Sequence, residues 1–165
     1  MARVRNARAR EKPLATADIV SLVVSATRTR APKRLGPYHE RRYSWIGKVW
    51  TGNEDVHYEI WPRPRLGLVE LGLHFEADAL TNARLLAAFR AREPEIRAAL
   101  GAAPLIEPWD KGWARVYESY PLENGRAAAE RYGARLAAYV AALEPIVRDE
   151  LPVDVPWRAR PRVRS

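Results

Sequence analysis

Apolar and polar residues alternate most regularly between residues 56 and 76, in two runs separated by the sequence PRPR. Such alternation is typical of strands with one buried face, and it predicts strands over 56–61 and 66–76 that form a hairpin. Successive side chains of a strand point to opposite faces, so one face of the second run is apolar: Val69, Leu71, Leu73 and Phe75. The other face collects the ionisable residues of both runs: His57, Glu59, Glu70, His74 and Glu76.

Before the hairpin, the pattern predicts one helix and one strand. Residues 14–28 carry β-branched apolar residues at a helical spacing, and Thr16 can cap a helix there; a strand is the alternative. Two prolines and a glycine in residues 29–37 predict a loop. Residues 41–50 predict a further strand, which ends at the turn-prone sequence TGN.

After the hairpin, the apolar spacing becomes helical over residues 79–100, where a Glu-Pro pair divides the segment into two helices. Residues 104–108 and 112–120 predict two more strands. The segment 126–149 predicts a long final helix, in which Pro145 should introduce a kink or an early end.

This order of elements predicts a single α+β domain over residues 13–151. We expect an N-terminal helix, an antiparallel meander of about five strands interrupted by one or two helices, and a long C-terminal helix packed on the sheet. The flanking segments 1–12 and 152–165 are expected to be basic tails, the first of them disordered.

Composition narrows the chemistry of any site. The chain has 165 residues, of which 47% are hydrophobic, and this is enough for a self-sufficient core. It has no cysteine, so a metal ion would have to be held by histidine and carboxylate. No stretch is long and apolar enough to span a membrane, and no secretory signal is evident, so we expect a cytoplasmic protein without membrane association. The high arginine and alanine content suggests a bacterial source.

The net charge of +8 is concentrated in the two tails and in residues 28–48, which hold seven basic residues and one glutamate. Flexible or clustered arginines can neutralise phosphates, so these segments predict binding to DNA, RNA or an acidic protein partner. The candidate polyanion-binding residues are Arg28, Arg30, Lys33, Arg34, Arg41, Arg42 and Lys48. Neighbouring aromatic residues that can stack on bases are Tyr38, Tyr43 and Trp45. Solubilising termini and ordinary core aromatics are the alternative interpretations.

The polar face of the hairpin is the other candidate site. A tight PRPR turn would place His57 or Glu59 opposite Glu70, with Cβ atoms about 5 Å apart. Carboxylates so close favour a cation between them, and histidine with carboxylate is an acceptable ligand set for Mg²⁺, Mn²⁺ or Zn²⁺. The alternative is the solvated face of an ordinary antiparallel sheet, which needs no cofactor. The chain has no phosphate-binding loop, no dinucleotide fingerprint and no nucleophile elbow, so no catalytic residue is assigned from a motif.

The runs GLVELGLHFEAD, PWDKGWARVY and RLAAYVAALEPIVRDEL, in this order, resemble small bacterial domains of unknown function that share a restriction-endonuclease-like core. The resemblance covers about residues 40–150 and implies a Mg²⁺-dependent site in which Glu59 and Glu70 stand at the carboxylate positions. Active members of that superfamily carry a Glu-x-Lys strand, whereas Glu70 is followed by Leu71 and Gly72. The resemblance therefore implies a degenerate member, or one whose cation comes from elsewhere, such as Lys48 or Arg115.

Three functional hypotheses follow. The first is a non-catalytic α+β binding domain that engages nucleic acid or another polyanionic partner through its arginine-rich segments. The second is a metal-dependent, nuclease-like hydrolase centred on His57, Glu59, Glu70 and His74. The third is a helix-grip domain that binds a hydrophobic ligand between its sheet and its long final helix. The oligomeric state is left open by the sequence.

Overall fold

Six antiparallel strands form one sheet in the computed structural model, which describes residues 12–151, and their order is β1-β2-β3-β4-β6-β5. The strands are β1 (His39–Arg42), β2 (Gly47–Trp50), β3 (Val56–Arg63), β4 (Leu68–Phe75), β5 (Leu105–Pro108) and β6 (Ala114–Pro121). The helices are α1 (Thr16–Arg30), α2 (Ala79–Ala91), α3 (Glu93–Leu100) and α4 (Arg126–Glu150). Single 3₁₀ turns occur at η1 (Lys33–Leu35), η2 (Pro64–Leu66) and η3 (Asp110–Gly112).

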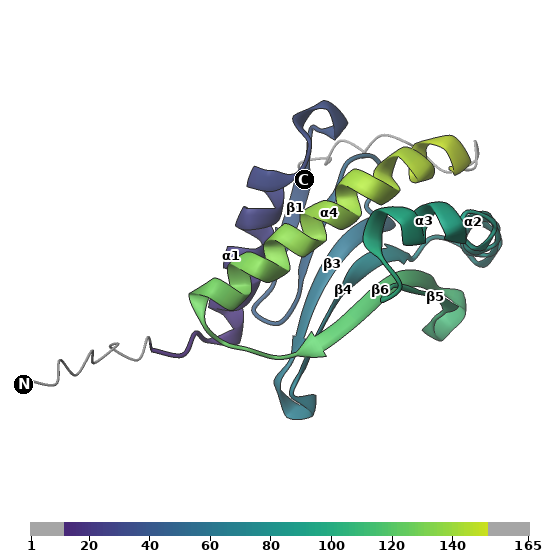
Figure 1. The fold of residues 1–165 in the computed structure, drawn as a ribbon. Helices are drawn as coiled ribbons and strands as arrows, with labels where there is room; N and C mark the ends of the chain where they lie inside the picture. The colour runs from purple at the N-terminus through teal and green to yellow at the C-terminus, as the bar shows by residue number, and fades with distance from the viewer. Residues whose placement is uncertain (1–11, 152–165) are drawn as a thin grey trace, which may run out of the picture.

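Helices α1 and α4 lie against each other across one face of the sheet, with α2 and α3 beside the end of α4 (Figure 1). The two long helices approach closely at Gly133, where an added Cβ would lie 2.4 Å from the Cβ of Ala26. Beneath them lies the apolar face predicted for the hairpin, and Phe75 packs edge-on against Phe89 of α2 at 5.1 Å between ring centroids. The layer between sheet and helices is therefore a packed apolar core.

The structure confirms the predicted α+β class, with the N-terminal helix and the long C-terminal helix in place. Three details differ from the sequence prediction. The segment 41–50 contains a turn, in which the amide of Tyr43 donates to the carbonyl of Ile46 (2.9 Å), so it forms parts of β1 and β2. Strand β5 lies at the sheet edge and β6 pairs with β4, so the last two strands do not continue the meander. Helix α4 passes through Pro145 and ends at Glu150 rather than early.

The register of the β3–β4 hairpin also differs from the prediction. Strand β3 continues through Pro62 to Arg63, which pairs with Leu68, and the turn occupies the four residues between them. This turn ends at Gly67, whose φ of 62° is the left-handed conformation that glycine adopts readily. His57 consequently faces His74, Glu59 faces Gly72, and Glu70 faces Trp61 instead of Glu59.

Strands β4 and β6 approach unusually closely at Gly72. A Cβ at this position would lie 2.2 Å from the carbonyl oxygen of Val116 and 2.6 Å from the Cα of Tyr117. A side chain of any kind is therefore excluded at Gly72 unless the backbone moves. Apart from Lys12, the two predicted basic tails fall outside residues 12–151 and are not described. None of the helices within this range combines the length and the apolar character that crossing a membrane would require.

Candidate metal centre

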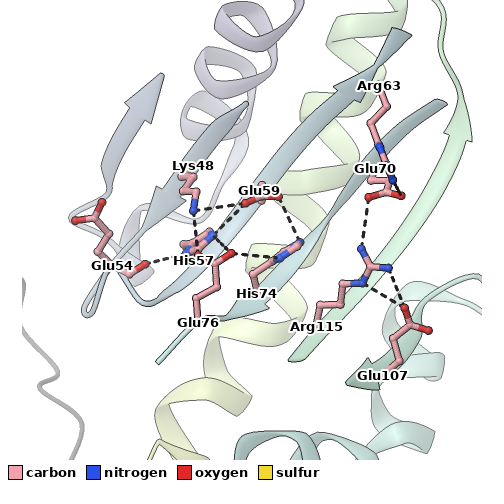
Figure 2. Close-up of polar contacts among 10 residues, drawn as sticks. All are labelled: Lys48, Glu54, His57, Glu59, Arg63, Glu70, His74, Glu76, Glu107 and Arg115. Carbon is pink, nitrogen blue, oxygen red and sulfur yellow. Dashed lines mark hydrogen bonds and ion pairs between the residues drawn. The ribbon is translucent and has the colours of Figure 1, made fainter. Parts of the chain in front are cut away.

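Four of the five predicted residues of the polar face meet at one place in the middle of the sheet. His57 and His74 are paired across β3 and β4, with their rings parallel within 10° and their centroids 5.8 Å apart. Glu59 lies one row further along β3, and Glu76 follows the last residue of β4. Figure 2 shows these side chains converging on one region together with Lys48 from β2.

The distances between these side chains are those of a ligand set. His57 Nε2 lies 3.2 Å from Glu59 Oε2 and 3.7 Å from Glu76 Oε1. His74 Nε2 lies 3.7 Å from Glu59 Oε1, and one ligand atom from each of the four residues lies within 4.8 Å of the other three. Zinc binds nitrogen and oxygen at about 2.0–2.2 Å, which separates neighbouring tetrahedral ligands by about 3.3–3.6 Å. The observed spacings therefore suit a transition-metal ion with little rearrangement.

The hydrogen bond of His57 to the backbone defines which of its nitrogens faces the cluster. Nδ1 lies 2.8 Å from the carbonyl oxygen of Glu54, and because a carbonyl can only accept, Nδ1 carries the proton. In the neutral ring, Nε2 then presents a lone pair to the carboxylate of Glu59. Metal-ligating histidines are commonly oriented in this way, with the second nitrogen donating to a backbone carbonyl.

Burial favours the neutral form of both histidines. The side chain of His57 is 1% exposed, and this burial, with a contribution from Lys48, lowers its pKa to about 4. Burial likewise lowers the pKa of His74 to about 4, against the opposing effect of the Glu59 carboxylate. The short contact between His57 and Glu59 would also fit an imidazolium–carboxylate pair, but desolvation of two buried rings outweighs that attraction. Neutral imidazole is the form that binds metal ions.

Lys48 brings a positive charge to the same cluster. Its Nζ lies 3.2 Å from Glu76 Oε2 and 3.7 Å from Glu59 Oε2. The position follows from the sheet register, in which Lys48 of β2 is paired with Glu59 of β3. The ammonium group thus partly neutralises the two carboxylates that the histidines face.

Glu70 belongs to a second, separate network on this face (Figure 2). Its carboxylate lies 3.0 Å from Arg63 and 3.4 Å from Arg115. Arg115 also pairs with Glu107 at 2.9 Å, and its guanidinium lies 3.5 Å from the ring centroid of Trp109. Glu70 is therefore held by arginines, and the sequence expectation that it faces His57 or Glu59 is wrong, because the hairpin turn lies further along the chain.

Three of the four clustered residues, Glu59, His74 and Glu76, line an aromatic cleft of about 430 Å³. One wall comes from the β1–β2 turn and β3, with Tyr43, Trp45 and Trp61; the other comes from the β5–β6 connection, with Trp109 and Trp113. The tryptophans of the second wall are more than 30 residues beyond the hairpin in sequence, so only the pairing of β6 with β4 could bring them to the site.

No protein-family model matches this sequence, and none of the curated proteins is a significant match to it. The role of the polar face must therefore be inferred from its geometry and charge. The resemblance to nuclease-like domains stays a prediction from sequence.

The basic segment does not form one surface patch. Arg28 and Arg42 both pair with Glu40 at 2.8 Å, and Arg42 also donates to the carbonyl of Ser21 on α1. Arg41 and Lys48 lie instead in the cleft on the polar face. Of the three remaining candidates, Lys33 and Arg34 lie in η1, and Arg30 pairs with Glu130 of α4 at 3.3 Å.

The predicted stacking residues are also divided. The hydroxyl of Tyr38 donates to the carbonyl of Pro32 at 2.6 Å, and the ring packs against the core. Tyr43 and Trp45 stack on each other, with ring centroids 6.1 Å apart, and are 43% and 53% exposed. Only these two are available to a ligand in the cleft.

Proposed function

We propose that this protein is a metal-dependent hydrolase whose divalent transition-metal ion is held by His57, Glu59 and His74, with Glu76 as a fourth ligand or as a base. The observation that carries the proposal is the geometry of His57, whose Nδ1 lies 2.8 Å from the Glu54 carbonyl oxygen while its Nε2 lies 3.2 Å from a carboxylate oxygen of Glu59. Two acceptors at this distance repel each other unless a cation lies between them. A metal ion bound by His57 and Glu59 would satisfy both acceptors.

The burial of the four residues supports a catalytic rather than a closed structural site. His57, Glu59 and His74 are buried, and two histidines with one carboxylate form a ligand set that leaves positions open for water. Glu76 is more exposed, with 18% of its side chain accessible, and it lines the cleft. The open positions would therefore face the cleft, on the side of Glu76.

When bound, such an ion lowers the pKa of a coordinated water to about 7. Glu76 is placed to accept the proton that the water releases as its oxygen bonds to an electrophilic carbon or phosphorus. The same proton can then pass from Glu76 to the leaving group as the bond between the leaving group and the carbon or phosphorus atom breaks. Lys48, beside Glu59 and Glu76, can stabilise the negative charge that develops meanwhile.

We keep the predicted cytoplasmic location as part of the proposal.

Calorimetric titration of chelator-treated protein with Zn²⁺ and with Mn²⁺ tests the proposal directly. We expect one ion per chain, and we expect His57→Gln and His74→Gln to weaken binding at least tenfold, because each removes a ligand. Lys48→Met should strengthen binding, because the ammonium competes for the same carboxylates. The absence of heat with both ions would refute the proposal.

Glu107→Gln is the matched control for this titration. Glu107 is a carboxylate on the same face of the sheet, but it pairs with Arg115 and is not one of the four clustered residues. Its replacement should leave the metal affinity unchanged. If Glu107→Gln weakened binding as much as His57→Gln, the affinity would come from general negative charge rather than from the proposed ligands.

A further inference from the structure

We propose that the aromatic cleft binds a linear, uncharged carbohydrate chain, which stacks on the two tryptophan walls and lies across the clustered carboxylates. That this carbohydrate is the substrate, rather than only a ligand, rests on the proposed hydrolase function. Its binding rests on the walls, their spacing and the charge of the cleft.

The first wall presents broad apolar surface to solvent. Trp45 stacks on Tyr43 and meets Trp61 edge-on, with ring centroids 6.5 Å apart and an angle of 70°. More than half of Trp45 is exposed even though it packs against two other rings. An exposed cluster of large apolar rings marks an interaction surface in a protein of ordinary composition.

The second wall is supported from below. The amide of Trp109 donates to the carbonyl of Trp113 at 2.7 Å, which ties the two residues together across the turn. The guanidinium of Arg115 lies 3.5 Å from the ring centroids of both Trp109 and Tyr117, and Glu107 holds it in place. A tryptophan fixed in this way gives a ligand a rigid platform at low entropic cost.

The spacing of the walls indicates an elongated ligand. Trp61 is paired with Glu70 at one end of β4, and the pairing of Phe75 with Ala114 places Trp113 beside Glu76 at the other. These two positions on the polar face are six residues apart along the chain, which is about 20 Å of strand. Between these two positions, β4 contributes Gly72, which has no side chain that could project into the cleft.

The charge of the cleft favours a neutral ligand over a nucleic acid. The charged residues that line it within the described chain are four carboxylates (Glu54, Glu59, Glu76 and Asp110) and two cations (Arg41 and Lys48). Both cations already pair with these carboxylates, Arg41 with Glu54 at 2.9 Å. This set carries a net charge of −2, which one bound divalent ion would bring to zero, so in neither state does it offer the positive charge that a phosphate backbone requires. Sugar hydroxyls can donate to carboxylates while the apolar faces of the rings stack on tryptophan.

Calorimetry and tryptophan fluorescence with cellohexaose, hexa-N-acetylchitohexaose and the oligonucleotide dT12 test this inference. We expect at least one neutral hexasaccharide to bind with a submillimolar Kd and more tightly than dT12. Trp45→Ala and Trp109→Ala should each weaken that binding at least tenfold, whereas Leu80→Ala, which removes an exposed apolar residue from α2, should not. Failure of both hexasaccharides to bind, or tighter binding of dT12, would overturn the inference.

Metal titrations of the unmodified protein, beside the hexasaccharide titrations, separate this inference from the proposed function. If the unmodified protein binds a hexasaccharide through Trp45 and Trp109 but binds neither Zn²⁺ nor Mn²⁺, the carbohydrate ligand is supported and the hydrolase is refuted. Metal binding without hexasaccharide binding would support the metal centre and overturn the carbohydrate inference. Circular dichroism of each variant establishes that it is folded before binding is measured.

Discussion

Mild acid should destabilise the metal-free protein through His57 and His74. The folded state holds both rings neutral, with pKa values lowered from 6.5 to about 4. An unfolded chain exposes the same rings to water, so it binds protons more readily in this range. The stabilising contribution of each histidine is therefore fully present above pH 6.5 and is lost as the pH falls towards 4.

The size of the effect follows from the two pKa values. A pKa difference of this size between the folded and unfolded states corresponds to about 3 kcal/mol of unfolding free energy for each histidine. Each excess proton bound by the unfolded state changes the free energy of unfolding by about 1.4 kcal/mol per pH unit. Charging one ring opposes charging the other, because the two are stacked at 5.8 Å. The ionisable groups that surround the pair are Lys48, Glu54, Glu59, Glu76 and Arg115.

Urea denaturation followed by circular dichroism, at intervals between pH 4.5 and 7.5, measures this slope. We expect the free energy of unfolding to fall steadily below pH 6.5, and His74→Gln to fall with about half the slope of the unmodified protein. A free energy that stays constant or rises between pH 7 and pH 5 would show that the rings are charged and paired with Glu59 and Glu76. The lone pair that the metal proposal requires would then not exist.

Three further substitutions test particular contacts. In thermal melts, Gly72→Ala should lower the free energy of unfolding by about 3 kcal/mol or more, because the new Cβ overlaps the backbone of β6. Gly125→Ala is the control and should have little effect, because no atom lies within 4 Å of its added Cβ. Glu144→Ala should cost about 3 kcal/mol in urea denaturation and Glu144→Gln clearly less, since the buried carboxylate accepts hydrogen bonds from two hydroxyls. Arg115→Lys should cost about 2 kcal/mol and shift the tryptophan emission, because an ammonium cannot stack between two rings as the guanidinium beside Trp109 does.

The alternation of apolar and polar residues was sufficient to predict the two faces of the hairpin. Val69 and Phe75 are fully buried on the helix side, and His57 and His74 share the opposite face, as the period of two requires. That period is insensitive to a shift of an even number of residues, so the faces were correct although Glu70 was paired with the wrong residue. The register depended on where the turn begins. The sequence PRPR did not indicate that the strand continues through Pro62 to Arg63.

Local sequence patterns could not predict the turn between β1 and β2 or the order of the last strands, and the two failures have different reasons. The turn at Tyr43 contains neither glycine nor proline, so its sequence looks like uninterrupted strand. The pairing of β6 with β4 is decided by which apolar faces the helices cover, a tertiary property that no short window carries. Trp109 and Trp113 reach the cleft only through that pairing, so the second aromatic wall could not be assigned from sequence.

The missing lysine after Glu70 has a physical explanation in this sheet. A Glu-x-Lys strand would place the lysine at position 72, where even a Cβ would lie 2.2 Å from a backbone oxygen of β6. The sheet register instead puts Lys48, Glu59 and Gly72 in one transverse row, with the ammonium 3.7 Å from the Glu59 carboxylate. A cation in this row can therefore come only from a neighbouring strand, and the absence of the sequence motif does not remove the positive charge from the site. Lys48 of β2 brings an ammonium group to this row from the neighbouring strand.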